Sequence, residues 1–434
     1  MKKSLLAVAA MTAFAGAAQA QSSVTVYGIL DVGYIGGNTT AVSSASLKNG
    51  GQTKTNVNQF GTSAEQTSRM GFKGTEDLGG GKSAFFTLEY YVYPTDTNVS
   101  GNATGGLVNR QSFVGLSQKG MGQFAVGTQY TPVFNAQAVT DPGQNNNIVG
   151  NVIYPSSAGI SNSYSQGASG VQTNTAGETV RTANTLTIAS DKFKGFGVNA
   201  MYTLNNANKS QTANPVNTNT NDTASIGGNT NASGWGLGAD YTYNKFYITA
   251  AYQSLKQLTT TTNANPATSQ PWTNAGPGTF AYGNPGATVP GITIPLANAV
   301  NVTDNQGFVG ATYDFGILKA YAQYINRKAT STVDTGYYLK RTAEQIGVRS
   351  FVTPTVEAWA SAGLGRYNAF GNNQPTANFN AWQLGSNYWL SKRTNLYAIY
   401  GQTIVTNYAY TSSAGTATVN NSANNYAIGL RHTF

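Results

Sequence analysis

The chain has 434 residues, of which 50 are glycine, 26 are tyrosine and only 9% are charged, and its net charge is +9 at pH 7. Soluble proteins carry about 25% charged residues, so a fully water-exposed surface is disfavoured. Cysteine is absent, which excludes disulfides, and the single histidine, His432, leaves no base or ligand cluster for catalysis or for zinc. We therefore expect no enzymatic activity, no cofactor and no metal site.

Residues 1–20 are predicted to be a signal peptide. Lys2 and Lys3 precede an apolar run that ends at Ala18, and Ala18-Gln19-Ala20 is a small-x-small cleavage site. The run is too short to span a membrane, and no later segment is apolar over about 18 residues. A soluble exported protein and a β-barrel remain. The low charge content favours a single barrel domain over residues 21–434, because only the lumen and loops of a barrel meet water.

About sixteen strands are predicted in that domain, each near the length of about 9 to 11 residues that a tilted spanning strand needs. The first two cover Val24 to Tyr34 and Thr67 to Asp77. In the clearest strands the large side chains alternate onto one face, which we expect to contact lipid. The predicted lipid-facing residues of three such strands are Phe196, Val198, Ala200 and Tyr202; Trp235, Leu237, Ala239, Tyr241 and Tyr243; and Phe246, Ile248, Ala250 and Tyr252.

The gaps between the predicted strands alternate in length. Short turns fall at 78–81, 119–120, 191–195, 244–245, 316, 352–354 and 391–393. Long gaps cover 35–66, 94–108, 132–180, 205–232, 257–304, 328–340, 367–378 and 406–422. Long loops at one end and short turns at the other are typical of outer-membrane barrels, whereas a soluble sandwich or propeller does not sort its loops in this way. The expected fold is all-β, a transmembrane antiparallel β-barrel.

The last strand ends on the final residue, Phe434. Period-two alternation places Tyr426, Ile428, Leu430 and Phe434 on one face and Ala427, Gly429, Arg431 and Thr433 on the other. The first face suits lipid and the second suits water. This ending resembles the C-terminal assembly signal by which outer-membrane barrels are handed to the insertion machinery.

Several segments resemble the general diffusion porins of betaproteobacterial outer membranes. They are Ser23 to Asp31, Ser68-Arg-Met-Gly-Phe-Lys-Gly-Thr-Glu-Asp-Leu-Gly79, Phe113 to Leu116 and Gly429 to Phe434. The resemblance covers nearly the whole mature chain and weakens in the loops. It implies a homotrimer of sixteen-stranded barrels, each with a water-filled pore narrowed by the third external loop. One departure is Gly127-Thr128-Gln129, where the family often has Gly-Arg-Gln.

The third loop, Pro132 to Val180, is longer than ordinary connections, and unstructured stretches of this length are usually functional or disordered. A floppy external loop is the alternative to folding into the lumen. The gap at 257–304 is nearly as long, so length alone does not decide. The family position of the loop after the fifth strand favours the lumen.

Four basic residues are predicted to line the pore. In the second strand Met70 and Phe72 face lipid, so Arg69 and Lys73 face the lumen; in the sixth, Arg181 has the inward parity. In the fourth strand Phe113 is taken as outward, which makes Arg110 inward, although Val114 and Leu116 then also point inward. The matching family positions of the three arginines form a basic wall at the constriction. Asp141 and Glu178 are the acids of the third loop, and Asp31 and Glu89 are further lumen acids.

Loss of Lys2 and Lys3 with the signal peptide lowers the net charge from +9 to +7. A basic lumen lowers the barrier for anions. The sequence therefore predicts a passive channel for small hydrophilic solutes that favours anions, with outer-membrane lipid, lipopolysaccharide and the insertion machinery as partners and no nucleic acid. A substrate-specific channel for one sugar or anion class, and a barrel with an adhesion role, remain as alternatives.

Overall fold

The computed structural model describes residues 23–41, 53–100, 106–155, 172–174, 177–209, 228–259, 302–332, 335, 338–370, 376–412 and 415–434. The predicted signal peptide and much of the predicted long loops lie outside the described residues. Among the described residues, no helix is long and apolar enough to cross a membrane.

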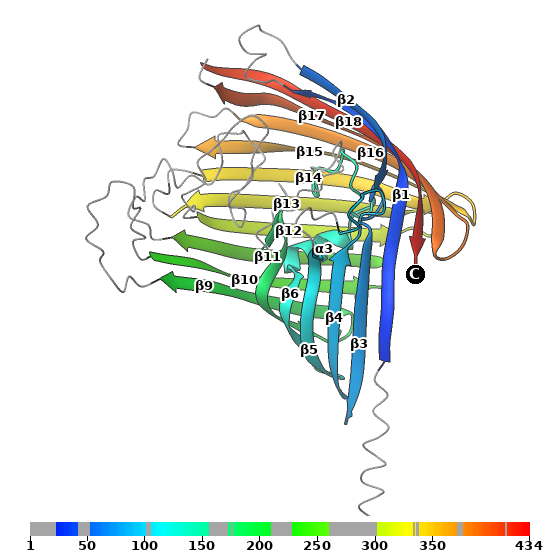
Figure 1. Ribbon diagram of the computed structural model, residues 1–434, viewed down its shortest axis with the longest axis vertical. Helices are drawn as coiled ribbons and strands as arrows, with labels where there is room; N and C mark the ends of the chain where they lie inside the picture. Colours follow the sequence, from blue (N-terminus) through cyan, green and yellow to red (C-terminus); the bar gives the residue numbers. More distant parts are fainter. Residues whose placement is uncertain are drawn as a thin grey trace, which may run out of the picture.

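The described strands form one antiparallel sheet, and one short helix, α3 (Pro132–Ala138), lies within it (Figure 1). The strands are β1 (Ser23–Ala41), β2 (Thr53–Thr62), β3 (Arg69–Gly79), β4 (Lys82–Tyr91), β5 (Asn109–Gln118), β6 (Gly122–Tyr130), β7 (Gln172–Asn174), β8 (Thr179–Ser190), β9 (Phe196–Lys209), β10 (Gly228–Tyr243), β11 (Phe246–Thr259), β12 (Val302–Asp314), β13 (Lys319–Ser331), β14 (Tyr338–Phe351), β15 (Val356–Phe370), β16 (Ala377–Trp389), β17 (Thr394–Ser412) and β18 (Gly415–Thr433).

The eighteen strands form a closed barrel with sixteen strand positions around its wall, which confirms the predicted fold class. β2 pairs with β1 from Val32 onward and β3 pairs with β1 up to Ile29, so β2 and β3 together form the second strand of the barrel. β7 is a three-residue strand of the third loop that pairs with β8 alone. The pairing of β1 with β18 closes the ring, and the C-terminus lies beside β1 (Figure 1).

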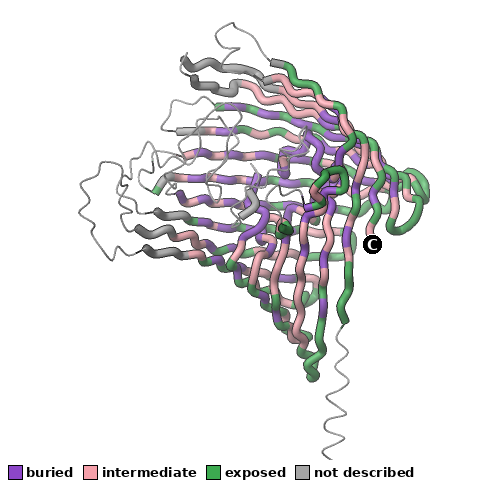
Figure 2. The backbone as a smooth tube through the Cα atoms, viewed as in Figure 1, coloured by how far each residue is buried: buried purple, intermediate pink, exposed green. Residues whose placement is uncertain are grey.

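The alternation of the two faces follows the sequence pattern. Of the predicted lipid-facing residues, Trp235, Leu237, Phe196 and Val198 are all exposed on the outside of the barrel. Along β11 to β16, buried residues alternate with more exposed ones, as Figure 2 shows. The outward parity predicted for the last strand is also confirmed, because Ile428, Leu430 and Phe434 are exposed while Ala427 and Arg431 are buried.

Two predicted loops are wrong in extent. The gap predicted at 35–66 is largely strand, because β1 continues to Ala41 and β2 covers Thr53 to Thr62. In the gap predicted at 406–422, strand continues to Ser412 in β17 and begins again at Gly415 in β18. The sequences of these extensions are rich in Asn, Thr and Ser, so they show no alternation of polarity that would predict a strand, and backbone pairing continues the ladder.

Candidate functional site

The third loop enters the barrel at the end of β6. Thr131 caps α3 by accepting a hydrogen bond from the backbone N–H of Phe134 (3.2 Å), and Pro132 occupies the first helical turn. The helix contacts β8 to β12 from inside. The predicted folding of this loop into the lumen is therefore confirmed for its described residues.

Five buried glutamines on the inner wall hold the loop in place. Their register shows that they form a row, because Gln253 of β11 pairs directly with Gln306 of β12, and Gln323 of β13 pairs directly with Gln345 of β14. Gln383 of β16 continues the row two strands further on. We call Gln253, Gln306, Gln323, Gln345 and Gln383 the glutamine row.

Each member of the glutamine row bonds to the loop. Gln345 Oε1 accepts from the N–H of Val152 (3.1 Å), and its Nε2 donates to Asp141 (3.1 Å). Gln323 Nε2 donates to the carbonyl of Gln137 (3.1 Å), and Gln306 Oε1 accepts from the N–H of Thr179 (2.8 Å). Because a buried amide needs partners for both of its ends, the row fixes the path of the loop along the wall.

Between these glutamines the wall carries glycine where the loop approaches the strand backbone. Gly363 of β15 pairs with Gln345, and a Cβ there would lie 2.3 Å from the side chain of Val152. Gly401 of β17 pairs with Gln383, and a Cβ there would lie 1.7 Å from the carbonyl oxygen of Val149. The loop can reach this wall only because neither strand has a side chain at that position.

Arg110 and Arg181 meet on the side of the lumen where the loop begins. Their guanidinium carbons lie 4.6 Å and 5.5 Å from the ring centre of Tyr91, and Arg181 also donates to the Tyr91 hydroxyl. Arg110 Nε is 2.7 Å from Glu89 Oε1, and its Nη2 donates to the hydroxyl of Tyr130 (2.9 Å). Both arginines are at most 5% exposed.

Arg69 completes this group, which we call the arginine cluster (Arg69, Arg110, Arg181). Arg69 lies within electrostatic range of both other arginines, and its Nε donates to the carbonyl of Thr67 (2.9 Å). Lys73 lies further along β3, with its Nζ 5.3 Å from the ring centre of Tyr27. The hydroxyl of Tyr27 donates to Glu89 (3.1 Å), so the cluster contains one bound carboxylate.

The predicted orientation of Phe113 is wrong. Val114 and Leu116 are exposed on the outside, and Phe113 shares the opposite face with Phe85, whose ring it contacts edge-on. Regular alternation from Val114 would turn Arg110 outward. However, Glu89 pairs with Gln111 and Tyr90 pairs with Asn109, so Arg110 is the extra residue of a β-bulge and points inward.

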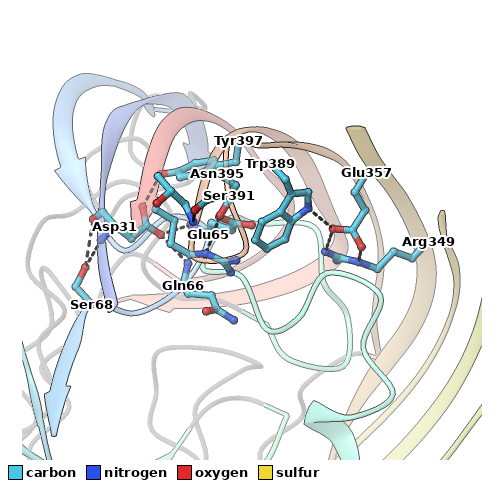
Figure 3. Close-up of polar contacts among 12 residues, drawn as sticks. Asp31, Glu65, Gln66, Ser68, Arg349, Glu357, Trp389, Ser391, Asn395 and Tyr397 are labelled. Carbon is cyan, nitrogen blue, oxygen red and sulfur yellow. Dashed lines mark hydrogen bonds and ion pairs between the residues drawn. The ribbon is translucent and has the colours of Figure 1, made fainter. Parts of the chain in front are cut away.

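A short segment between β2 and β3, residues 63–68, bends into the lumen over Asp31 (Figure 3). Asp31 Oδ2 accepts from the N–H groups of Glu65 (2.8 Å) and Gln66 (2.7 Å), and Oδ1 accepts from the hydroxyl of Tyr397 (2.7 Å). This segment meets the tip of the third loop, because the N–H of Asn147 donates to the carbonyl of Ala64 (3.0 Å). Asp31 is thus an anchor for the segment.

The acids of the third loop lie away from the arginine cluster. Asp141 is bound within the loop, where it accepts from the N–H of Asn145 (2.7 Å) and from Asn151 (3.0 Å). Burial raises the pKa of the Asp141 carboxyl above its ordinary value. Burial also raises the pKa of the Glu178 carboxyl to about 8, although Arg327 and Arg341 act in the opposite direction. At neutral pH the protonated form of Glu178 therefore predominates.

Three further lumen arginines, Arg327, Arg341 and Arg349, were not among the predicted pore residues, and a fourth, Arg431, was predicted only to lie on the water-facing side of the last strand. Arg327 forms a two-point ion pair with Asp304, Arg349 with Glu357, and Arg431 lies 3.5 Å from Glu65. Arg341 bonds to the hydroxyl of Tyr367 (3.0 Å) and to the carbonyl of Val152. Their inward parity was readable from outward Tyr324, Ile346 and Ile428. Tyr91 and Tyr130 contact the arginine cluster, but the sequence around them indicated only which face of the strand they lie on.

Raising the pH from about 6 to about 9 should reduce any preference of the pore for anions, because Glu178 changes from neutral to negative as the pH passes its pKa of about 8. The measurement is the zero-current potential in a salt gradient at each pH. Glu178→Gln should reduce the pH dependence. An equal dependence in this variant would show that another group titrates in the pore.

The arrangement supports passage of ions along a polar, charged lumen. Within the described part of the chain, no three side chains of the types that ligate metals come together. The arginine cluster has one closely bound carboxylate for three guanidiniums, whereas Arg327 of β13, Arg349 of β14 and Arg431 of β18 each lie within 4.0 Å of their own acid. The excess of positive charge in the cluster concentrates a positive field near β3, β5 and β8.

Comparisons with known proteins agree with this architecture. The profile of a family described as Gram-negative porin matches residues 7–408. An outer membrane porin protein of Bordetella pertussis is 28% identical over the full length of both chains. The structure of an anion-selective porin from Comamonas acidovorans is similar with a TM-score of 0.62 and 20% identity, covering 95% of this chain and 100% of that one. The structure of an in-vitro folded trimer form of OmpT from Vibrio cholerae is similar with a TM-score of 0.54 and 14% identity, covering 95% of this chain and 99% of that one.

Proposed function

This chain belongs to the Gram-negative porin family and forms a passive channel in the outer membrane, and we propose that the channel favours small anions. The observation that carries the proposal is the arginine cluster: three guanidiniums from three strands gather around Tyr91 and Tyr130 with one carboxylate, Glu89, among them. Fixed charges of one sign inside low-dielectric walls raise the local concentration of the opposite ion. The anion-selective porin of similar fold is consistent with this reading.

The direct test uses the wild-type protein in a planar bilayer. Stepwise, ohmic conductance increases would establish an open pore, and the zero-current potential in a potassium chloride gradient would give the sign of selectivity. We expect the sign that corresponds to chloride passing faster than potassium. A cation-selective wild type would refute the proposal while leaving the fold and family untouched.

We further propose that the domain spanning residues 21–434 assembles as a homotrimer after cleavage of residues 1–20, that it contacts outer-membrane lipid and the insertion machinery, and that it has no catalytic activity. The trimer form of a porin of similar fold supports the assembly. The barrel should migrate in detergent gels as an oligomer that dissociates on heating. Mass spectrometry of the purified protein should find Gln21 at its N-terminus. A monomer stable without detergent would contradict the proposal.

Deletion of Phe434 should lower the amount of protein in the outer membrane several-fold, with little loss of intrinsic stability. Phe434 exchanges two backbone hydrogen bonds with Gly28, both of 3.1 Å, and each contributes about 1 kcal/mol in a large sheet. The expected defect therefore lies in recognition of the last strand. Quantification of outer-membrane fractions tests this, with thermal unfolding of refolded protein as the stability control. Wild-type amounts of the variant would contradict it.

A further inference from the structure

Six residues between β2 and β3, the segment 63–68, lie opposite only two residues of β1. The pairing of β2 with β1 begins at Val32, and the pairing of β3 with β1 ends at Ile29. On this side of β1, Leu30 and Asp31 alone face the segment. Because the excess chain cannot pair in the wall of the barrel, it leaves the wall and bends into the lumen (Figure 3).

Asp31 holds both ends of this segment with its backbone and the middle with its side chain. The carbonyl of Asp31 accepts from the N–H of Ser63 (2.9 Å), and its N–H donates to the hydroxyl of Ser68 (2.9 Å). The φ angle of Ser63 is 67°, so the chain turns inward through the left-handed region, which is unfavourable for serine. The charge-assisted hydrogen bonds from the N–H groups of Glu65 and Gln66 to the Asp31 carboxylate offset this cost.

The far end of the segment fixes the side chain of Arg69. Arg69 Nε donates to the carbonyl of Thr67 (2.9 Å), which belongs to the segment. Within the described part of the chain, Arg69 takes part in no ion pair of 4.0 Å or less, whereas Arg110 does. Arg69 is also half-buried, while Arg110 and Arg181 are buried. Arg69 is therefore the member of the arginine cluster that an ion in the lumen can approach.

These contacts give Asp31 an effect opposite to that of its charge alone. A carboxylate in the wall of the lumen weakens a preference for anions through its field. Asp31 is fully buried against the segment, however, and through the segment it holds a guanidinium in place. We propose that Asp31 is a positioning residue for anion selectivity, acting through the segment 63–68 on Arg69. This inference rests on the proposed anion preference of the channel.

The test is the variant Asp31→Asn, whose amide keeps the shape of the side chain but replaces one acceptor oxygen with a donor. The chloride-to-potassium permeability ratio, measured from zero-current potentials, should fall because an unheld Arg69 spends part of its time away from the path of the ions. The expected fall is up to about threefold, the effect of one unit charge on an ion about 7 Å away. Loss of the negative charge alone would raise the ratio, so a raised or unchanged ratio would overturn the proposal.

The matched control is Tyr397→Phe. It removes the hydrogen bond from the Tyr397 hydroxyl to Asp31 Oδ1 (2.7 Å) but none of the bonds between the carboxylate and the segment. Its permeability ratio should equal that of wild type. A fall as large as that of Asp31→Asn would show that any disturbance around the carboxylate lowers the ratio, which would refute the assignment.

A double-mutant comparison decides whether Asp31 acts through Arg69. In an Arg69→Ser background, Asp31→Asn should no longer lower the permeability ratio, and the loss of its charge should raise the ratio instead. An equal fall in both backgrounds would mean that Asp31 acts on selectivity by another route, and the proposal would be wrong.

Arg69→Lys tests the same contact without changing the buried carboxylate. Lysine keeps the positive charge but has no Nε–H to donate to the carbonyl of Thr67, so the ratio should fall although the net charge is unchanged. A wild-type ratio in this variant would contradict the proposal. Each comparison is a change relative to wild type, so a cation-favouring wild type would refute the proposed function and leave this test of Asp31 intact.

Discussion

The triple variant Arg69→Ser/Arg110→Ser/Arg181→Ser should change the channel from anion-favouring to cation-favouring. It removes three positive charges and leaves Glu89 without the arginine that lies 2.7 Å from it in the wild type. The interaction energy between a unit charge and an ion about 7 Å away is about 0.6 kcal/mol in water, and it is larger between low-dielectric walls. After screening by salt we expect the chloride-to-potassium permeability ratio, measured from zero-current potentials, to fall about 20-fold.

Glu89→Gln is the matched opposite change. It removes the carboxylate that neutralises Arg110 and should strengthen the anion preference. Both effects should fade with salt, because the Debye length falls from about 10 Å at 0.1 M to about 3 Å at 1 M. If the triple variant keeps its anion preference, selectivity resides elsewhere in the lumen.

Gln383→Ala should loosen the tip of the third loop and make the single-channel current noisy. Gln383 Nε2 donates to Asn146 (3.1 Å) and to the carbonyls of Ile148 (2.7 Å) and Val149 (2.9 Å), and its Oε1 accepts from Asn146 (3.0 Å). The Nε2 group has two N–H donors, so at most three of these four bonds form at once. At about 1 kcal/mol net for each bond, their loss raises the population of the detached tip up to about 150-fold. Current fluctuations in a planar bilayer report this population.

Gln402→Ala is the control for this experiment. Gln402 lies on the neighbouring strand β17, and its side chain contacts Trp382 Nε1 on the outer face (3.3 Å). Its replacement should leave the current as quiet as that of wild type. Gln345→Ala, which removes another member of the glutamine row, should add to the noise of Gln383→Ala. A quiet Gln383→Ala channel would mean that the loop is held by other contacts.

The barrel could be predicted because the alternation of lipid-facing and lumen-facing residues is visible within each strand. Residues such as Trp235, Leu237 and Tyr241 alternate with small or polar ones, and this pattern alone fixes which face contacts lipid. The rule failed where a strand is irregular. A bulge at Arg110 reverses the phase, so the outward parity assigned to Phe113 was wrong although Arg110 does point inward. Nothing in the local sequence marks a bulge whose cause is pairing with a distant strand.

The site was less predictable for the same reason. The three arginines could be placed on the inner face, but the ion pair between Arg110 and Glu89 and the contacts with Tyr91 depend on the register of neighbouring strands. The glutamine row is also invisible to a strand-by-strand reading, because an inward glutamine is ordinary in any polar lumen. Only the register shows that Gln253 pairs with Gln306 and that Gln323 pairs with Gln345.

The segment at 63–68 has a consequence for the order of assembly. The loop tip touches this segment near the start of the chain and Gln383 near its end, contacts that join residues 84 and 237 positions apart. Such distant contacts form late, because the intervening chain must first be ordered. The tip can therefore make its full set of contacts only after β16, which carries Gln383, has joined the sheet. The constriction of the pore is thus completed late, when most of the barrel wall is already in place.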